Sequence, residues 1–322
     1  MKKIAFFLGK GGVGKTTISA TVACQMSRSG TKILIVSLDP AHNLGDVFQT
    51  KLTNEKRPLD TNLDGMEIDL SAWVARYLDE SRKEIKANYA YHSAINVDSY
   101  INILKYSPGT EEYAVLWAIE HIYQEYAAAC DLIIFDTPPT ALTLRFLAMP
   151  SITSLWVREL SAMREKILKK RQTILAINPD AAIVKNFSPA GADASEETPV
   201  QGAMDKKDDQ IYIKLSGIGK RLAELQRLFS RESYLSVVVN PDTLSLAEAL
   251  RIREELGRLG VHINSVCLNK ASPEGAGREN VEKNFGDCPV FMSRLLAEGV
   301  RAVSDLGVID VEGVKNDIKA AR

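Results

Sequence analysis

The sequence predicts an α/β fold built on a doubly wound, mostly parallel sheet, and three observations predict it. Apolar runs of strand length recur along the 322 residues, and continuous runs of this kind are typical of strands buried on both faces of a parallel sheet. Helical patterns separate successive runs, and strands joined by helices form right-handed parallel connections. A glycine-rich turn joins the first run to the first helix.

The first elements are expected to form a βαβ unit. Residues 4–8 have the sequence IAFFL and predict the first strand. A helix is expected over residues 16–29, because Gly30 suits a left-handed C-cap. Residues 32–37 are rich in Ile, Leu and Val and predict the second strand, and residues 132–135 repeat that pattern.

Two more strands are expected in the last third of the chain. Residues 234–239 predict one of them. The sequence SLAE at residues 245–248 is a capping-box pattern, so a helix is expected to begin there and to close near Gly260. Residues 261–268 predict the other strand, which ends before Asn269.

Two stretches do not match the expected sheet. Residues 71–129 are largely helical in pattern, with a break at Pro108-Gly109. Residues 151–230 carry an amphipathic helix at each end, and the segment 178–210 between them has few large apolar residues. Core packing explains the apolar stripes of these helices without a ligand, and a partner-binding groove is the alternative. The stripes consist of Trp156, Leu160, Met163 and Ile167 in the first helix and Ile211, Leu215, Ile218, Leu222, Leu225 and Phe229 in the last.

The composition excludes several classes of protein. An apolar content of 45% excludes a disordered chain. No apolar stretch approaches the roughly 20 residues that span a bilayer, so no direct membrane insertion is expected. The 40 basic and 41 acidic residues balance, which argues against a nucleic-acid partner. The four cysteines have no CxxC pair and the four histidines are dispersed, so we expect a cytoplasmic protein without zinc. The cysteines are Cys24, Cys130, Cys267 and Cys288.

The glycine-rich turn satisfies the P-loop pattern G-x-x-x-x-G-K-[ST] between a strand and a helix. Glycines let the backbone N–H groups surround a phosphate, and the helix N-terminus favours an anion. Lys15 is expected to neutralise the β- and γ-phosphates, and the Thr16 hydroxyl to hold Mg²⁺. The expected nucleotide-binding residues here are Gly9, Lys10, Gly11, Gly12, Val13, Gly14, Lys15, Thr16 and Thr17.

Two carboxylates follow expected strands, at the edge where α/β sheets bind ligands. Asp136 fits a Walker B acid that acts on Mg²⁺ through a water molecule. Asp39 is expected to orient the attacking water. Residues 269–272 have the sequence NKAS, which lacks the acid of the guanine-reading N-K-x-D pattern. ATP is therefore expected to bind better than GTP.

These motifs resemble the ArsA family, which includes arsenite-pump ATPases and ATPases that target tail-anchored membrane proteins. Residues 39–48, DPAHNLGDVF, are very similar to the first switch of the family, and residues 108–112, PGTEE, resemble its P-G-x-x-E segment. Residues 136–145, DTPPTALTLR, resemble the second switch. The second lysine of the P-loop, Lys10, marks the signature-lysine subclass, whose members use it across a dimer interface.

The resemblance extends to the last third of the chain and implies further site residues. The stretch 234–270 places Asp242 and Asn269 at positions that contact the nucleoside in the family. The stretch 289–298, which begins at Pro289, resembles the loop that flanks the adenine. The chain resembles one half of the duplicated arsenite ATPase, so a homodimer is expected.

The sequence also departs from the family pattern. Ala141 and Leu142 replace the Gly-His of the second switch. The zinc-binding CxxC and the cysteine trio of metalloid-stimulated pumps are absent, so we do not expect arsenite to stimulate hydrolysis. The inserts contain few methionines, which gives a soft cargo surface little support.

One domain is expected over residues 1–322, with a nucleotide core and a helical subdomain. The core is expected to comprise residues 1–70, 130–150 and 231–310, and the subdomain residues 71–129 and 151–230. The resemblance implies a Mg²⁺-dependent ATPase that opens and closes as a homodimer and serves a membrane pump or delivers hydrophobic membrane-protein cargo. Alternatives are a MinD/ParA-like positioning ATPase, disfavoured by the highly charged residues 308–322, and a slow nucleotide-sensing regulatory module.

Overall fold

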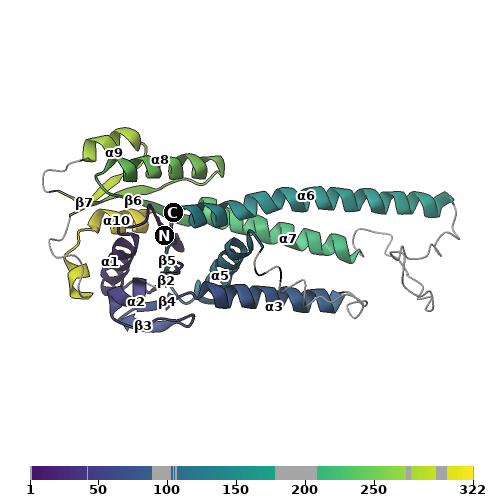
Figure 1. Ribbon diagram of the computed structural model, residues 1–322, viewed down its shortest axis with the longest axis horizontal. Helices are drawn as coiled ribbons and strands as arrows, with labels where there is room; N and C mark the ends of the chain where they lie inside the picture. Colours follow the sequence, from purple (N-terminus) through teal and green to yellow (C-terminus); the bar gives the residue numbers. More distant parts are fainter. Residues whose placement is uncertain are drawn as a thin grey trace. The chain divides into compact units, whose positions relative to one another are not determined.

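A computed structural model describes most of the chain: residues 2–41, 43–88, 103, 105, 107–177, 209–272, 277–294 and 303–321. It contains an eight-stranded sheet in the order β3-β4-β2-β5-β1-β6-β7-β8 (Figure 1). Neighbouring strands are parallel except for β3 and β4, which are antiparallel. The predicted α/β class with a mostly parallel sheet is confirmed. The strands are β1 (Ile4–Leu8), β2 (Ile33–Ser37), β3 (Arg57–Asp60), β4 (Leu63–Glu67), β5 (Leu132–Asp136), β6 (Ser233–Val239), β7 (Ser265–Ala271) and β8 (Val290–Arg294).

Helices and short helical turns connect these strands. Sequence reasoning located the helices that begin at the P-loop and after β6. It also expected helices on both sides of Pro108-Gly109, where α3 ends before the break and α5 begins after it. The helical elements are α1 (Lys15–Arg28), α2 (Asn43–Phe48), α3 (Leu70–Asn88), α5 (Thr110–Tyr126), α6 (Thr140–Ile177), α7 (Gln210–Arg227), a π-helical turn (Leu228–Glu232), α8 (Thr243–Arg258), α9 (Arg278–Asn284), a 3-10 turn (Val303–Gly307) and α10 (Glu312–Ala320).

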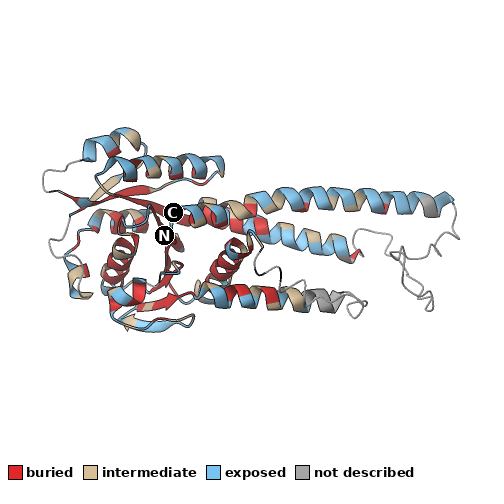
Figure 2. Cartoon of the chain, viewed as in Figure 1, coloured by how far each residue is buried: buried red, intermediate tan, exposed pale blue. Residues whose placement is uncertain are grey.

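The core lies on and around the central strands. Every residue of β1, β2, β5 and β6 is buried, as continuous apolar runs predict (Figure 2). Phe6 of β1 stacks on Phe135 of β5, with ring centroids 5.1 Å apart. The charged helix α10 does carry an apolar side, contrary to expectation for residues 308–322, but Val314 and Ile318 are buried in this core. That side is therefore not available to a membrane.

Three details of the expected elements were wrong. The helix α8 does not begin at Ser245, because Asp242 is its N-cap and accepts a hydrogen bond from the Ser245 N–H at 2.8 Å. The strand β7 begins at Ser265, four residues after the expected start at position 261. Residues 290–294 form the strand β8, although they were expected to belong to a loop.

The contacts divide the chain into two compact units. The first comprises Met1–Met149 and Arg227–Arg322, and the second Pro150–Gln226. The first unit includes α3 and α5, which were expected in the helical subdomain; they pack through Trp73 and Trp117, whose rings meet edge to face at 5.5 Å. Across the described ranges, no helix is both long and apolar enough to cross a membrane.

The second unit is built from the part of α6 after residue 149 and from α7. Arg164 of α6 binds both carboxylate oxygens of Asp209, which precedes α7, at 3.1 and 2.6 Å. Tyr212 of α7 donates a hydrogen bond to Glu165 at 3.0 Å. Most of the expected irregular segment 178–210 lies outside the described residues. The two helices are thus joined by polar contacts at one end.

Candidate functional site: a phosphate-binding loop at the carboxyl edge of the sheet

The loop between β1 and α1 has a backbone that only glycine fits at two positions. Gly9 has φ +150°, and a Cβ there would overlap the carbonyl of Val238 in β6. Gly14 has φ +94°, and a Cβ there would overlap the side-chain amide of Asn269. The loop therefore lies close against β6 and β7 at the start of α1, where glycine-rich turns and helix N-termini favour an anion.

Lys15 is the first residue of α1 and is buried behind this loop. Its ammonium group lies 3.5 Å from the carbonyl of Lys10. Burial lowers the pKa of Lys15, while Asp136 and Asp39 raise it by their negative charge. A desolvated cation that faces a concave loop is suited to bind phosphate oxygens.

Thr16 and Asp136 form a polar pair at the end of β5. The Thr16 hydroxyl donates a hydrogen bond to Oδ2 of Asp136 at 2.7 Å. The other carboxylate oxygen, Oδ1, is buried and has no hydrogen-bond partner among the described residues. Burial raises the pKa of Asp136 to about 7; the charges of Asp39 and Glu67 add to the rise, and the bond from Thr16 and the charge of Lys15 oppose it.

This pair fits Mg²⁺. A hydroxyl and a carboxylate supply the hard oxygen ligands that Mg²⁺ prefers. An unpartnered buried carboxylate oxygen is costly, and a cation or a water molecule held by a cation removes that cost. In the part of the chain that the structure describes, no group of three or more His, Cys, Asp or Glu is placed to hold a metal. A bound Mg²⁺ would therefore complete its shell with water and nucleotide oxygens.

The loop opens into a cavity of about 390 Å³. Lys15, Thr16, Asp39, Asn269 and Lys270 are among the residues that line it. Asn269 and Lys270 belong to the end of β7, Asp39 follows β2, and Lys15 and Thr16 follow the loop after β1, so the cavity lies at the carboxyl edge of the sheet, where α/β sheets bind ligands. The cavity has the size of a small-molecule site.

Comparisons with known proteins identify the family. A family model described as anion-transporting ATPase (ArsA ATPase) matches residues 2–310. The chain belongs to the ArsA ATPase family. It is 31% identical to the putative arsenical pump-driving ATPase 2 of Aquifex aeolicus over 291 residues, which cover 88% of this chain and 87% of the relative. It is also 31% identical to the ATPase get3 of Schizosaccharomyces japonicus, over 83% of this chain and 74% of that protein. With the ATPase ASNA1 homolog of Entamoeba histolytica the identity is 30%, over 84% and 77%.

The segment that resembles the first switch of ArsA ATPases borders the cavity. Asp39 is half-buried and accepts a hydrogen bond from the Ala41 N–H at 3.0 Å. The segment continues into α2, where Asn43 and Val47 line the cavity. His42 lies outside the described residues. Asp39 thus lies beside Lys15 at one wall of the expected phosphate site.

The segment that resembles the second switch is anchored to the sheet and to α5. The Thr137 hydroxyl donates to the carbonyl of Phe7 in β1 at 2.7 Å. The Thr143 hydroxyl donates to the carbonyl of Pro138 at 2.9 Å. Arg145 forms an ion pair with the buried Glu112 at 3.2 Å. Glu112 belongs to the PGTEE segment, so two motifs that are far apart in sequence meet here.

Lys10, Asp242 and Asn269 differ in how close they lie to the cavity. Asn269 is buried and donates to the carbonyl of Val13 at 2.8 Å. Asp242 is exposed after β6, where its carboxylate caps α8, and it does not line the cavity. The side chain of Lys10 is exposed, whereas its backbone carbonyl accepts from Lys15.

The structure does not bring Pro289 to the other site residues. Pro289 precedes β8, and its carbonyl accepts from the N–H of Val266 at the start of β7, so it lies at the amino edge of the sheet. The cavity is lined instead by Ser293 and Arg294 at the carboxyl end of β8. Ser293 is buried, and its hydroxyl has no hydrogen-bond partner among the described residues.

Some contributors to the cavity were not among the predicted site residues. Ser293 and Arg294 were assigned to a loop, because the stretch 289–298 resembles the adenine-flanking loop of the family, but they belong to the strand β8. Lys270 donates to the carbonyl of Gly12 at 3.1 Å and has a positive φ of 55°. A positive φ at a non-glycine residue is uncommon and marks a conformation that the surrounding fold imposes. Only the three-dimensional arrangement reveals these contacts.

Proposed function

We propose that the protein is a Mg²⁺-dependent ATPase that works as a homodimeric switch of the ArsA type. The observation that carries the proposal is the group formed by the buried Lys15 and Asp136 and the half-buried Thr16 beside a glycine loop. Its charges are arranged for a triphosphate and a metal ion, and the exposed Lys10 is free to reach a second subunit. The missing acid at Ser272 supports ATP over GTP as the substrate.

The residues of the site would divide the work of hydrolysis. The loop N–H groups and Lys15 bind the β- and γ-phosphates, while Thr16 and Asp136 hold Mg²⁺, Asp136 through a water molecule. A bound Mg²⁺ would neutralise part of the phosphate charge. Asp39 orients a water molecule toward the γ-phosphate, because a carboxylate is a weak base and contributes mainly by positioning. Lys10 of the partner subunit adds a cation when the dimer closes, in the manner of an arginine finger.

The covalent course of α6 provides a route from the nucleotide to a partner. The helix begins at Thr140, four residues after Asp136, and continues to Ile177 in the second unit. The segment that senses the phosphates therefore passes directly into this helix. We propose that opening and closing of the dimer changes the surface that the second unit presents.

The surface of the second unit is suited to an apolar partner. Large apolar side chains on α6 and α7 are exposed, and Trp156 has 67% of its surface accessible. Exposed apolar clusters in soluble proteins mark interaction sites. We propose that they contact hydrophobic membrane-protein cargo or a membrane-bound pump partner. The exposed residues are Ile152, Leu155, Trp156, Leu160, Met163, Ile167, Ile177, Ile211, Ile213 and Ile218.

Two lysine variants test the ATPase proposal. Lys15→Ala is expected to lose ATP binding, whereas Lys10→Ala is expected to keep much of the binding and to lose hydrolysis. Lys283→Ala, an exposed lysine of α9, is the matched control and is expected to behave as wild type. Nucleotide affinity and steady-state phosphate release measure the two effects. Equal ATP binding by Lys15→Ala and wild type would contradict the proposed site.

A second experiment separates the switch from the slow sensing module. The Trp156→Asp and Ile218→Asp variants are expected to weaken binding of a hydrophobic transmembrane peptide without lowering thermal stability, because both side chains are exposed. Leu222, which belongs to the predicted apolar stripe of the last helix, is only 5% exposed and is unsuitable as a probe of a groove. A slow basal ATPase that no apolar peptide or membrane partner stimulates would favour the sensing module.

A further inference from the structure

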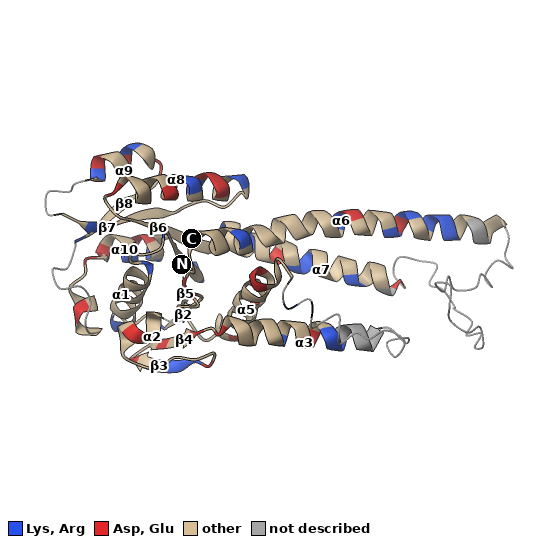
Figure 3. Cartoon of the chain, in the orientation of Figure 1, with Lys and Arg blue, Asp and Glu red and all other residues tan. Residues whose placement is uncertain are grey.

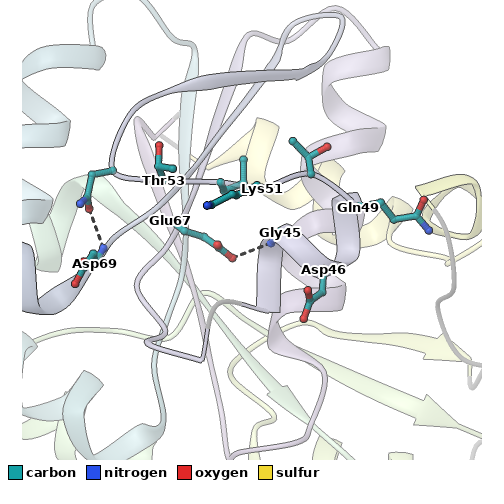
Figure 4. A pocket seen from close by; sticks show the side chains of 10 residues that line it. Gly45, Asp46, Gln49, Lys51, Thr53, Glu67 and Asp69 are labelled. Carbon is teal, nitrogen blue, oxygen red and sulfur yellow. Dashed lines mark hydrogen bonds between the residues drawn. The ribbon is translucent and has the colours of Figure 1, made fainter.

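A second cavity, of about 870 Å³, lies beside α2 (Figure 4). Its walls are α2, the connection that follows this helix and the end of β4. Gly45 and Asp46 contribute from α2, Lys51 and Leu52 from the connection, and Glu67 from β4. The volume is within the range of small-molecule sites, which run from roughly 300 to 1,000 Å³.

Hydrogen bonds hold the walls of this cavity in place. The buried carboxylate of Glu67 accepts from the Gly45 N–H at 2.7 Å. The Thr50 N–H donates to the Gly45 carbonyl at 3.0 Å, and a Cβ on Gly45 would lie 2.9 Å from the Thr50 carbonyl oxygen. Asn54 accepts from the Asp69 N–H at 2.8 Å and from the Trp73 indole at 3.0 Å. The cavity is therefore preformed.

The helix α2 is a wall shared by both cavities. Asn43 and Val47, four residues apart and so on one face of the helix, line the nucleotide cavity. Gly45, Asp46 and Gln49 line the second cavity. Because β4 is parallel to β2, its carboxyl end with Glu67 lies at the same edge of the sheet as the P-loop. A ligand in the second cavity would thus touch the helix that follows Asp39.

The lining determines the class of ligand. Three carboxylates, those of Asp46, Glu67 and Asp69, line the cavity, together with one ammonium group, that of Lys51. An anion would be repelled here, and the carboxylates are not clustered as metal ligands among the described residues. Leu52 is buried and adds an apolar patch to the polar lining. Amino groups separated by short alkyl segments match this combination of separated negative charges and apolar surface.

We propose that the second cavity binds a small organic polycation of the polyamine class and that its occupancy alters nucleotide affinity through α2. The binding itself is independent of the proposed ATPase function, and the coupling rests on it. By thermodynamic reciprocity, nucleotide must change the affinity for the polycation by the same factor.

Direct titration of spermidine into the nucleotide-free protein tests the binding. Calorimetry is expected to give about one site per chain for wild type. Affinity should fall about tenfold in Asp46→Asn/Asp69→Asn, because two of the three carboxylates lose their charge. Both aspartates are exposed, and an asparagine at position 69 still accepts the Ala72 N–H, so folding is retained. Glu279→Gln, on α9 away from the cavity, is the control and should bind as wild type. Lys51→Glu should bind more tightly.

Three results would overturn the site. These are no binding by wild type, equal binding by the double variant, and a stoichiometry far above one, which would show diffuse counter-ion attraction. The coupling is tested with ADP, whose affinity should change about threefold with saturating spermidine in wild type and not in the double variant. Spermidine also binds ADP directly in solution, and this effect is the same for both proteins. Comparison with the double variant therefore controls for it. Spermidine binding without any ADP binding would refute the proposed ATPase site and leave the polycation site standing, whereas ADP binding without a shift would refute the coupling alone.

Discussion

The carboxyl edge of the sheet and the helical pair α6–α7 use apolar residues in opposite ways. In the first unit, apolar strands are fully buried, and polar groups such as Thr16 and Asp136 are concentrated at one edge. In the second unit, Trp156 and Met163 are exposed by 67% and 56%, respectively. The first pattern is typical of a preorganised site, and the second is typical of a surface that binds a partner.

The outer surface of the first unit carries charges of both signs. On the outer helices α8 and α9 of the first unit, acidic and basic residues alternate (Figure 3). Arg258 lies near Glu254, and Arg278 near Glu282, at 2.6 Å in each pair. Such exposed pairs contribute little to stability but keep a surface soluble. The comparison therefore predicts that substitutions of buried residues will affect stability, whereas substitutions of the exposed apolar residues of the second unit will affect partner binding.

The largest effect on stability is expected from the substitution of a buried apolar residue of the second unit. Leu225→Asp should destabilise the protein by about 3–5 kcal/mol, because it buries an unpaired carboxylate at a side chain that is 4% exposed. Trp156→Asp should change stability by no more than about 0.5 kcal/mol. Urea unfolding followed by circular dichroism measures both. Equal losses would show that Trp156 is buried in solution and would remove the contrast.

The next largest effect is the loss of hydrolysis expected when Asp136 is replaced. Asp136→Asn should lower hydrolysis about 100-fold, because the amide cannot replace a carboxylate that holds the water of a metal ion. Burial raises the pKa of Asp136 to about 7 in the metal-free protein, so protons should compete with Mg²⁺ for this carboxylate. The Mg²⁺ concentration that gives half-maximal phosphate release should therefore rise as pH falls below about 7, which a Mg²⁺ titration across pH 5.5–8.5 checks. A half-maximal Mg²⁺ concentration that does not change with pH would contradict metal binding by Asp136.

The same raised pKa predicts a stability effect of defined sign. The folded protein binds the Asp136 proton more tightly than the unfolded chain, so this stabilisation is full below the ordinary carboxyl pKa and is lost as pH rises through about 7. Asp136→Asn should therefore raise the melting temperature of the nucleotide-free protein more at pH 8 than at pH 4.5. The opposite order would contradict the burial of this carboxylate.

A smaller effect is expected from the ion pair of the second unit. The Arg164 bond holds the pKa of Asp209 below its usual range, so the pair stabilises at neutral pH and its contribution is lost as pH falls through that lowered pKa. Arg164→Ala should cost about 1–3 kcal/mol at pH 7. Arg164→Lys should recover only part, because lysine cannot form the bidentate contact. A lysine variant as stable as wild type would show that the geometry is unimportant.

The sequence predicted the P-loop and the central strands well, because both depend on local composition. A continuous apolar run such as that of β5 has few alternatives to a buried strand, and Gly9 and Gly14 occupy positions where no side chain fits. Polar residues interrupt the apolar sequence of the strands β3, β4 and β8, so these strands lack such runs. Asp242 was expected to contact the nucleoside and was not identified as the cap of α8, since Ser245 offered a competing capping pattern.

Periodicity could not predict which residues of an amphipathic face are buried and which are exposed. Leu225 and Ile218 belong to the same predicted stripe, yet the first is buried and the second is 45% exposed. Periodicity shows that a face is apolar and does not show what covers it. The contributions of Ser293 and Arg294 were likewise hidden, since they depend on how β8 pairs with β7.

One measurement tests the proposed dimeric switch most directly. Lys10→Ala and Asp39→Asn homodimers should each be inactive, because one lacks the cation supplied across the interface and the other lacks the residue that orients water. A mixed dimer has one site that combines an intact Asp39 with the intact Lys10 of the other chain. ATPase activity should therefore reappear when the two variants are mixed. No recovery, despite heterodimers demonstrated by mass spectrometry, would contradict action of Lys10 between subunits and with it the ATP-driven closure proposed for this protein.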